Sequence, residues 1–239
     1  PYSYIHPNDV VQCNVNGTVH VLEACRRHAV GRLVAFSTSE VYGTAQYTPI
    51  DEAHPLHPQS PYAASKVGAD QICLSYARSF DLPVTICRPF NTYGPRQPAR
   101  AVLPTIITQA LAGDVIRLGS LTPRRDLVFA EDTARGAMLL AECDAGLGEV
   151  VNLATGTDVS VGDLAEAVIR LTGGGKRIEQ DASRIRPAAS EVMQLLGCAK
   201  KMRALTGWTP EVTLDQGLER TIAWVARNRH LFSDLTYRI

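Results

Sequence analysis

The start of the chain alternates between a helical and a strand-like hydrophobic pattern. Apolar residues at positions 11, 15, 19, 22 and 25 repeat every three to four residues, which predicts a helix over residues 10–29. The sequence Leu-Val-Ala-Phe that follows is apolar on both faces, as in a strand buried inside a parallel sheet, and predicts a strand over residues 32–37.

The same alternation repeats after a polar, proline-rich loop at residues 44–61. A helix is predicted over residues 62–80 and a second buried strand over residues 83–88. Helix, strand, helix and strand joined by short links indicate βαβ units, so we expect an α/β fold with a doubly wound parallel sheet.

The second half of the chain has a less regular pattern. We predict, in order, a helix at 101–112, a strand at 115–118, a helix at 131–143, a strand at 150–153, and helices at 161–171, 190–205 and 214–227. This order predicts two domains. Residues 1–96 form the doubly wound layer, to which a helix and strand around 127–153 return, and residues 97–239 form most of a smaller α+β domain.

Composition narrows the possible partners. Lysine plus arginine and aspartate plus glutamate each number 24, so no net positive charge is available for nucleic acid or an anionic membrane, and neither is an expected partner. No uncharged stretch reaches the roughly 18 residues of a membrane span. The six cysteines include no Cys-x-x-Cys pair and predict free thiols in a reducing compartment, the cytoplasm. His54 and His57 lie between prolines with no cysteine cluster nearby, so no metal site is expected.

Candidate chemistry gathers after the two predicted strands, where open α/β sheets bind ligands. Tyr62 and Lys66 are four residues apart on one helix and so share a face. A cation beside a phenol lowers the pKa of the phenol and makes it a usable acid or base, although the same spacing also describes an ordinary surface pair. Thr38 and Glu40 alternate onto one side of a segment that we expect to be extended, where they either act on a substrate or cap the next turn.

Arginines follow the second strand and recur later in the chain. Residues 88–96 form a turn-rich loop with an arginine at each end, and Arg125, Arg184 and Arg186 are further cations. Two or three such side chains suit a diphosphate, whereas any one of them alone is more typical of a surface ion pair.

Taken together, these stretches resemble the extended short-chain dehydrogenase/reductase family, the NAD-dependent nucleotide-sugar epimerases and dehydratases. The similar stretches cover essentially the whole chain in the right order: 14–18, 37–43, 60–66, 88–96, 125–128, 207–210 and 217–218. The resemblance implies a Rossmann-like sheet with a C-terminal substrate domain, NAD as cofactor, a nucleoside-diphosphate sugar as substrate, and a homodimer through the helix that carries Tyr62 and Lys66.

The resemblance also implies roles for residues. Tyr62 and Lys66 would be the hydride-transfer dyad, Thr38 would polarise the C4 oxygen, and Ser39 and Glu40 would complete the catalytic set. Cofactor contacts would come from Asn14, Ser37, Tyr62, Lys66, Pro89 and Phe90, and substrate contacts from Asn91, Val102, Arg125 and Arg186.

Glu40 distinguishes the reactions within this family. The 4,6-dehydratases need a base for C5 and place glutamate here, as in GDP-mannose, dTDP-glucose and legionaminic-pathway enzymes, whereas simple 4-epimerases have small residues. UDP-glucuronate decarboxylases also have Thr-Ser-Glu, usually with an acidic residue inside Tyr-x-x-x-Lys, where this chain has Ala63, Ala64 and Ser65. We therefore expect a dehydratase, with an epimerase or a decarboxylase as the alternatives. Because serine replaces the aspartate of dTDP-glucose dehydratases at Ser39, the acid for the C6 hydroxyl stays open between Glu40 and a bound water.

One family motif is not found in residues 1–239. The Gly-x-x-Gly-x-x-Gly turn that seats the cofactor pyrophosphate, and the acidic residue that binds its ribose, are both missing, and we expect them upstream of Pro1. On this expectation the 239 residues alone would lack the first strands of the sheet and bind NAD weakly. The second hypothesis is therefore a truncated, inactive member of the family.

Overall fold

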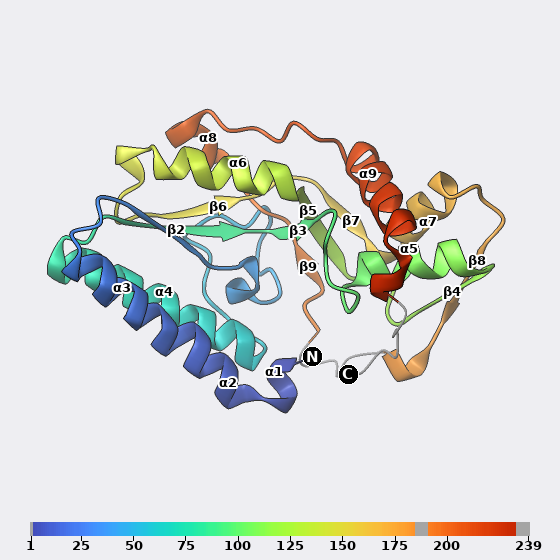
Figure 1. Ribbon diagram of the computed structural model, residues 1–239, viewed down its shortest axis with the longest axis horizontal. Coiled ribbons are helices and arrows are strands. Elements are labelled where there is room, and N and C mark those ends of the chain that lie inside the picture. The colour runs from blue at the N-terminus through green and yellow to red at the C-terminus, as the bar shows by residue number, and fades with distance from the viewer. Residues whose placement is uncertain (1, 185–190, 233–239) are drawn as a thin grey trace.

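A three-stranded parallel sheet forms the centre of the first half of the molecule (Figure 1). The computed structural model describes residues 2–184 and 191–232. Strands β1 (Leu33–Phe36), β2 (Val84–Pro89) and β6 (Val150–Leu153) lie in the order β1-β2-β6, with both pairs parallel. The first five residues of β2 are buried, because the strand is central and covered on both faces. The predicted parallel α/β sheet is confirmed.

Helices cover both faces of this sheet. Figure 1 shows α2 (Pro7–Val11), α3 (Gly17–Arg27) and α4 (Pro61–Phe80) on one face, and α6 (Ala130–Ala141) and α8 (Lys200–Thr206) on the other. A short helix, α1 (Tyr2–Ile5), precedes them. The helix predicted at 10–29 is divided by a π-helical turn over Gln12–Asn16.

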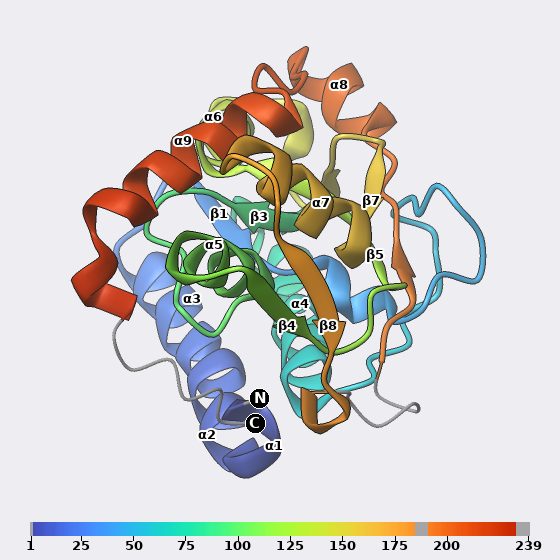
Figure 2. The same ribbon diagram turned by 90° about the vertical axis from the view of Figure 1, so that its right-hand side faces the viewer.

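The second half adds a four-stranded sheet of short strands, a two-stranded sheet and a helical layer (Figure 2). In the larger sheet, β5 pairs with β3 and β9 in parallel and with β7 antiparallel, and β4 pairs with β8 in parallel in the other sheet. The bounds are β3 (Asn91–Tyr93), β4 (Val115–Leu118), β5 (Arg124–Phe129), β7 (Asp158–Ser160), β8 (Arg177–Gln180) and β9 (Gln194–Leu195), with helices α5 (Val102–Ala112), α7 (Val161–Leu171) and α9 (Leu214–Arg227).

The helix predicted at 190–205 is wrong over most of its length. Only its last third is helical, as α8, because Gln194 and Leu195 add strand β9 to β5 and bury Leu195. Gly197 follows where a side chain has no room, since a Cβ there would lie 2.3 Å from the Ala154 Cβ and 2.7 Å from the Phe90 ring. The apolar spacing of this segment therefore reflects an extended chain crossing the core.

The described helices include none that is both long enough and apolar enough to span a bilayer.

Candidate active site

Helix α4 places Tyr62 and Lys66 at the edge of the parallel sheet. The helix begins at Pro61, and its N-cap Ser60 accepts a hydrogen bond from the Ala63 N–H (3.1 Å), so Tyr62 lies in the first turn and Lys66 one turn later. Tyr62 is 37% exposed. The Lys66 Nζ donates to the backbone oxygen of Phe36, the last residue of β1, at 2.5 Å.

The electrostatics of Tyr62 differ from the sequence-based prediction. Burial raises the pKa of its hydroxyl, Glu40 and Asp70 raise it further, and a hydrogen bond from Thr38 lowers it. The expected lowering by Lys66 is wrong, because burial dominates and the lysine ammonium is directed to the Phe36 oxygen. Burial also lowers the pKa of Lys66, which the charge of Asp70 partly offsets.

Thr38 and Glu40 are brought to Tyr62 by a tight turn. The extended segment predicted here ends at Thr38, because Ser39–Tyr42 forms a 3₁₀ helix that Thr38 caps by accepting from the Glu40 N–H (3.2 Å). Val41 and Tyr42 are fully buried by this turn. Thr38 thus caps the turn, as the alternative interpretation held, and also hydrogen-bonds Tyr62.

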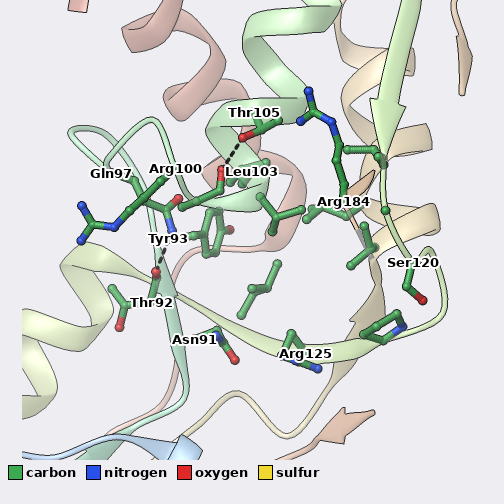
Figure 3. Close-up of a pocket in the computed structure, with 18 of the residues that line it drawn as sticks. Asn91, Thr92, Tyr93, Gln97, Arg100, Leu103, Thr105, Ser120, Arg125 and Arg184 are labelled. Atoms are coloured by element: carbon green, nitrogen blue, oxygen red, sulfur yellow. Dashed lines mark hydrogen bonds between the residues drawn. The ribbon is translucent and has the colours of Figure 1, made fainter. Parts of the chain in front are cut away.

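A pocket of about 300 Å³ opens beside Glu40 (Figure 3). Figure 3 shows the side chains of Asn91 and Arg125 on one side of it and those of Leu103 and Thr105, from α5, on the opposite side. The lining combines cations, carboxylates, amides and apolar side chains: Arg100, Arg125, Arg184, Glu40, Glu191, Asn91, Gln97, Val102, Leu103, Leu118, Leu127, Val161 and Leu164. Apolar side chains combined with convergent polar groups are typical of a small-molecule site, and the polar share of this lining suits a charged, hydroxyl-rich ligand.

Two amide oxygens of this pocket have no hydrogen-bond partner among the described residues. The Asn91 Oδ1 and the Gln97 Oε1 are both buried, and the Gln97 Nε2 donates to the Thr92 oxygen at 3.4 Å. A buried acceptor without a donor costs free energy. The two oxygens therefore suit a ligand that brings hydroxyl or amide donors, as a sugar does.

Arg125 and Glu191 face each other loosely across the pocket lining. Their nearest charged atoms are 3.7 Å apart, and the Arg125 Nη1 also donates to the Arg124 oxygen (3.0 Å). A guanidinium held in this way at a largely buried position can bind a phosphate in addition to the carboxylate.

The other predicted site residues lie in varied surroundings. Val102 is 43% exposed and lines the pocket, whereas the Phe90 ring, 1% exposed, is packed in the core. The Asn14 Nδ2 donates to the Ser65 Oγ (2.9 Å), and the Ser37 Oγ donates to Asp70 (2.8 Å).

Three predicted site residues remain: Ser39, Pro89 and Arg186. Ser39 is 1% exposed, so its hydroxyl lies below the surface of the site. Pro89 ends β2 and is partly buried. Arg186 lies outside the described residues.

Sequence reasoning missed Gln97, Arg100 and Glu191 in the lining. Gln97 directly follows the arginine-rich loop at 88–96, which could have drawn attention to it. Glu191 reaches the pocket from a segment mistaken for a helix, so no local signal pointed to it.

The residues around Tyr62 fit the nicotinamide end of NAD, the cofactor that the family resemblance implies. An ammonium has three N–H donors, and the Phe36 oxygen engages one of those of Lys66, so ribose hydroxyls can share the group. The partly exposed phenol of Tyr62 stands one helical turn away on the same face.

Comparison with known families and proteins gives one consistent result. A family model described as GDP-mannose 4,6 dehydratase matches residues 1–221. The dTDP-glucose 4,6-dehydratase of Actinoplanes sp. is 34% identical over 235 residues, which cover 95% of this chain and 70% of the relative. A putative UDP-glucose 4-epimerase of Methanocaldococcus jannaschii is 31% identical, covering 90% and 70%.

Solved structures give the same result for the fold. DesIV, a dTDP-glucose 4,6-dehydratase from Streptomyces venezuelae solved with NAD and TYD bound, superposes with a TM-score of 0.87 at 30% identity. The similarity covers 98% of this chain and 72% of that one.

Proposed function

The chain belongs to the NAD-dependent epimerase/dehydratase family, the extended short-chain dehydrogenases/reductases, and we propose that it acts as a nucleoside-diphosphate-sugar 4,6-dehydratase. The observation that carries the proposal is the position of Glu40. Its carboxylate lines the pocket and lies close enough to Tyr62 to raise the pKa of the phenol. A carboxylate that borders the pocket and lies close to a phenol fits the removal of a C5 proton.

Substrate binding follows from the lining of the pocket. Arg125 binds the diphosphate, and Val102 and Leu118 supply apolar surface for the base. Asn91 places its unpaired oxygen toward a sugar hydroxyl. These contacts orient C4, C5 and C6 of the hexose toward Thr38, Glu40 and Tyr62.

Tyr62 and Glu40 move the protons of the proposed reaction. Tyr62 takes the proton of the C4 hydroxyl, with Thr38 hydrogen-bonded to the phenol and Lys66 providing a positive charge on the same helix face. NAD, when bound, would take up a hydride from C4 and return it to C6.

Glu40 removes the C5 proton and returns it to the departing oxygen. The C5–H bond breaks toward the carboxylate, a C5–C6 double bond forms, and the C6 hydroxyl leaves with the proton that Glu40 has just gained, as water. The burial of Ser39 supports Glu40 as the acid for this step. With the hydride restored at C6 and a proton added at C5, balanced by the proton that Tyr62 took from the C4 hydroxyl, the organic product is a 4-keto-6-deoxy sugar.

Mass spectrometry of the product tests this function. The full-length protein would be incubated with NAD and, in separate reactions, UDP-N-acetylglucosamine, GDP-N-acetylglucosamine, dTDP-glucose, GDP-mannose and UDP-glucuronate. Loss of one water from one sugar is the expected result and names the substrate. An isomer of unchanged mass would replace the proposal with 4-epimerisation, the activity in the name of the M. jannaschii relative. Loss of carbon dioxide from the glucuronate would make it a decarboxylase.

A further inference from the structure

A buried ion pair lies directly beneath Tyr62 and Lys66. Asp70 follows Lys66 by one turn of α4, on the same face, and its side chain and that of Arg88 are each 4% exposed. The Asp70 Oδ2 accepts from the Arg88 Nε (3.0 Å) and lies 2.9 Å from the Arg88 Nη2. A fully desolvated pair of this kind adds little net stability compared with apolar side chains, so its effect has to be sought in what it positions.

This pair reaches both ends of the turn that carries Thr38 and Glu40. At the start of the turn, the Ser37 Oγ donates to the Asp70 Oδ2 (2.8 Å). At its end, the Tyr42 Oη accepts from the Arg88 Nη1 (3.0 Å). Residues 38–41 lie between these two anchors, and Thr38 also hydrogen-bonds Tyr62 on α4.

The Tyr42 anchor is itself fixed to the sheet. The Tyr42 Oη donates to the Asn152 Oδ1 on β6 (2.8 Å), and the Asn152 Nδ2 donates to the Ile50 oxygen (3.2 Å). The chain of bonds therefore runs from α4 through β2 to β6, and each of its side chains is buried.

Asp70 also acts electrostatically on both groups of the dyad. Tyr62 faces Thr38, Glu40 and Asp70, and the charges of the two carboxylates raise the pKa of its phenol. Lys66 faces Asp70 and Cys73 on its own helix and Cys13 from the π-helical turn, and Asp70 is the largest of the influences that raise its pKa against burial.

We propose that Asp70 is a positioning residue of this site: through Ser37 and Arg88 it holds the Thr38–Glu40 turn in register with Tyr62, and its carboxylate is one of the charges close to Tyr62 and Lys66. The part of this that concerns turnover rests on the proposed function. The geometry and the ionisation of the dyad do not depend on which sugar is processed.

The first experiment needs no turnover. The pH titration of Tyr62 is isolated as the difference in tyrosinate absorbance between each protein and its Tyr62→Phe counterpart. Asp70→Asn keeps the shape of the side chain and removes its charge, so the titration should move to lower pH. The matched control is Asp132→Asn, which also alters a buried aspartate paired with an arginine, but on α6, and should leave the Tyr62 titration in place.

A second experiment follows the turn directly. Ser37→Ala removes one anchor without leaving a charge unpaired, so it remains informative if Asp70→Asn does not fold. Hydrogen exchange in a peptide covering residues 37–43 should speed up several-fold in Ser37→Ala and stay unchanged in Asp132→Asn. If turnover of a nucleotide sugar has been found, kcat should fall roughly tenfold in Ser37→Ala with little change in KM, because misplacement of the reacting groups acts on the chemical step.

These readouts decide the proposal independently of the substrate. An unmoved Tyr62 titration in folded Asp70→Asn, or exchange in Ser37→Ala no faster than in Asp132→Asn, would overturn it. If no nucleotide sugar were converted, the dehydratase proposal would fail while a shifted titration and faster exchange still supported the positioning role.

Discussion

The two sides of the site satisfy their polar groups in opposite ways. Beneath Tyr62, the side chains of Asp70, Arg88, Tyr42 and Asn152 hydrogen-bond one another in a continuous buried chain. Across the pocket, by contrast, Asn91 leaves its oxygen without a partner among the described residues, as does Gln97, and Arg125 meets Glu191 only at 3.7 Å. The first side satisfies its polar groups internally, whereas the second leaves two amide oxygens without a partner among the described residues.

This difference teaches which part of the site is organised in advance. Groups that must act on protons are held by internal bonds, which costs no reorganisation during the reaction. If the pocket binds a nucleotide sugar as proposed, its lining groups are left to be satisfied on binding, which would make binding selective for ligands with matching donors. Substitutions on the two sides should consequently fail in different ways.

The largest effect is expected for Glu40→Gln. If Glu40 is the C5 base, kcat for water loss should fall by about 10²- to 10⁴-fold, while reduction of bound NAD by the sugar persists because Tyr62 is intact. Product mass and the near-ultraviolet absorbance of the reduced cofactor measure the two steps separately. Glu191→Gln is the matched carboxylate control from the ligand-satisfied side and should change KM rather than kcat. Normal turnover in Glu40→Gln would remove Glu40 from this role.

The next largest effect is on the free energy of unfolding, and it should differ between Asn152 and Asn91. Asn152→Ala breaks bonds to Tyr42 and Ile50 and should lower the free energy of unfolding by about 3 kcal/mol. Asn91→Ala removes an oxygen that has no partner and should cost less than about 1 kcal/mol while weakening sugar binding. Urea unfolding measures both changes in the free energy of unfolding, provided that its slope with urea concentration is the same in each variant. Equal losses would mean that the two sides are not built differently.

A smaller effect separates neighbouring arginines. Arg125→Ala should raise KM about tenfold or more, because one charge-assisted contact to the diphosphate is lost. Arg124 precedes Arg125 on β5 but pairs with Asp158 on β7 (2.9 Å), so Arg124→Ala should leave KM nearly unchanged. Titration calorimetry with a nucleoside diphosphate at two salt concentrations gives the affinities, and the Arg125 effect should shrink as salt increases.

The smallest effect is a dependence of stability on pH. Burial lowers the pKa of Lys66 in the folded protein below its ordinary value of 10.5. Between the folded and the unfolded pKa, the unfolded chain therefore binds more protons than the folded protein. The contribution of Lys66 to the free energy of unfolding consequently rises with pH across that interval. Lys66→Met should therefore stabilise the protein at neutral pH, on the order of a few tenths of a kcal/mol, and the gain should fade as pH approaches 10.5. Lys201→Met, at a surface pair with Glu149, is the control. A gain that grew with pH would contradict this assignment.

Much of the fold could be predicted from hydrophobic spacing alone. The strands around Leu33 and Val84 and the long helix that carries Tyr62 are found where the pattern placed them, since each follows one period along the chain. Leu195 was misplaced because its burial is decided by pairing with β5, which is distant in sequence. The β3 and β5 strands were missed for the same reason.

The part of the candidate site that lies on one helix could be predicted from the spacing of its residues along the chain. Tyr62 and Lys66 share a helical face, and Asp70 continues the same spacing by one more turn, so it could have been found. The 3₁₀ turn at Ser39–Tyr42 could not, because its geometry depends on burying Tyr42 against Arg88 and Asn152. Glu191 joins the pocket only through tertiary packing.

Gly197 limits how this site can diversify. Its N–H binds Asp126, the neighbour of Arg125, and any side chain there would collide with Phe90, the neighbour of Asn91. A mutation at this one position would therefore disturb two walls of the pocket at once, whereas Val102 stands half open to solvent and can vary singly. New substrate preferences would accordingly be reached by changes at positions such as Val102, and a library built to retarget the pocket should leave the Gly197 codon fixed.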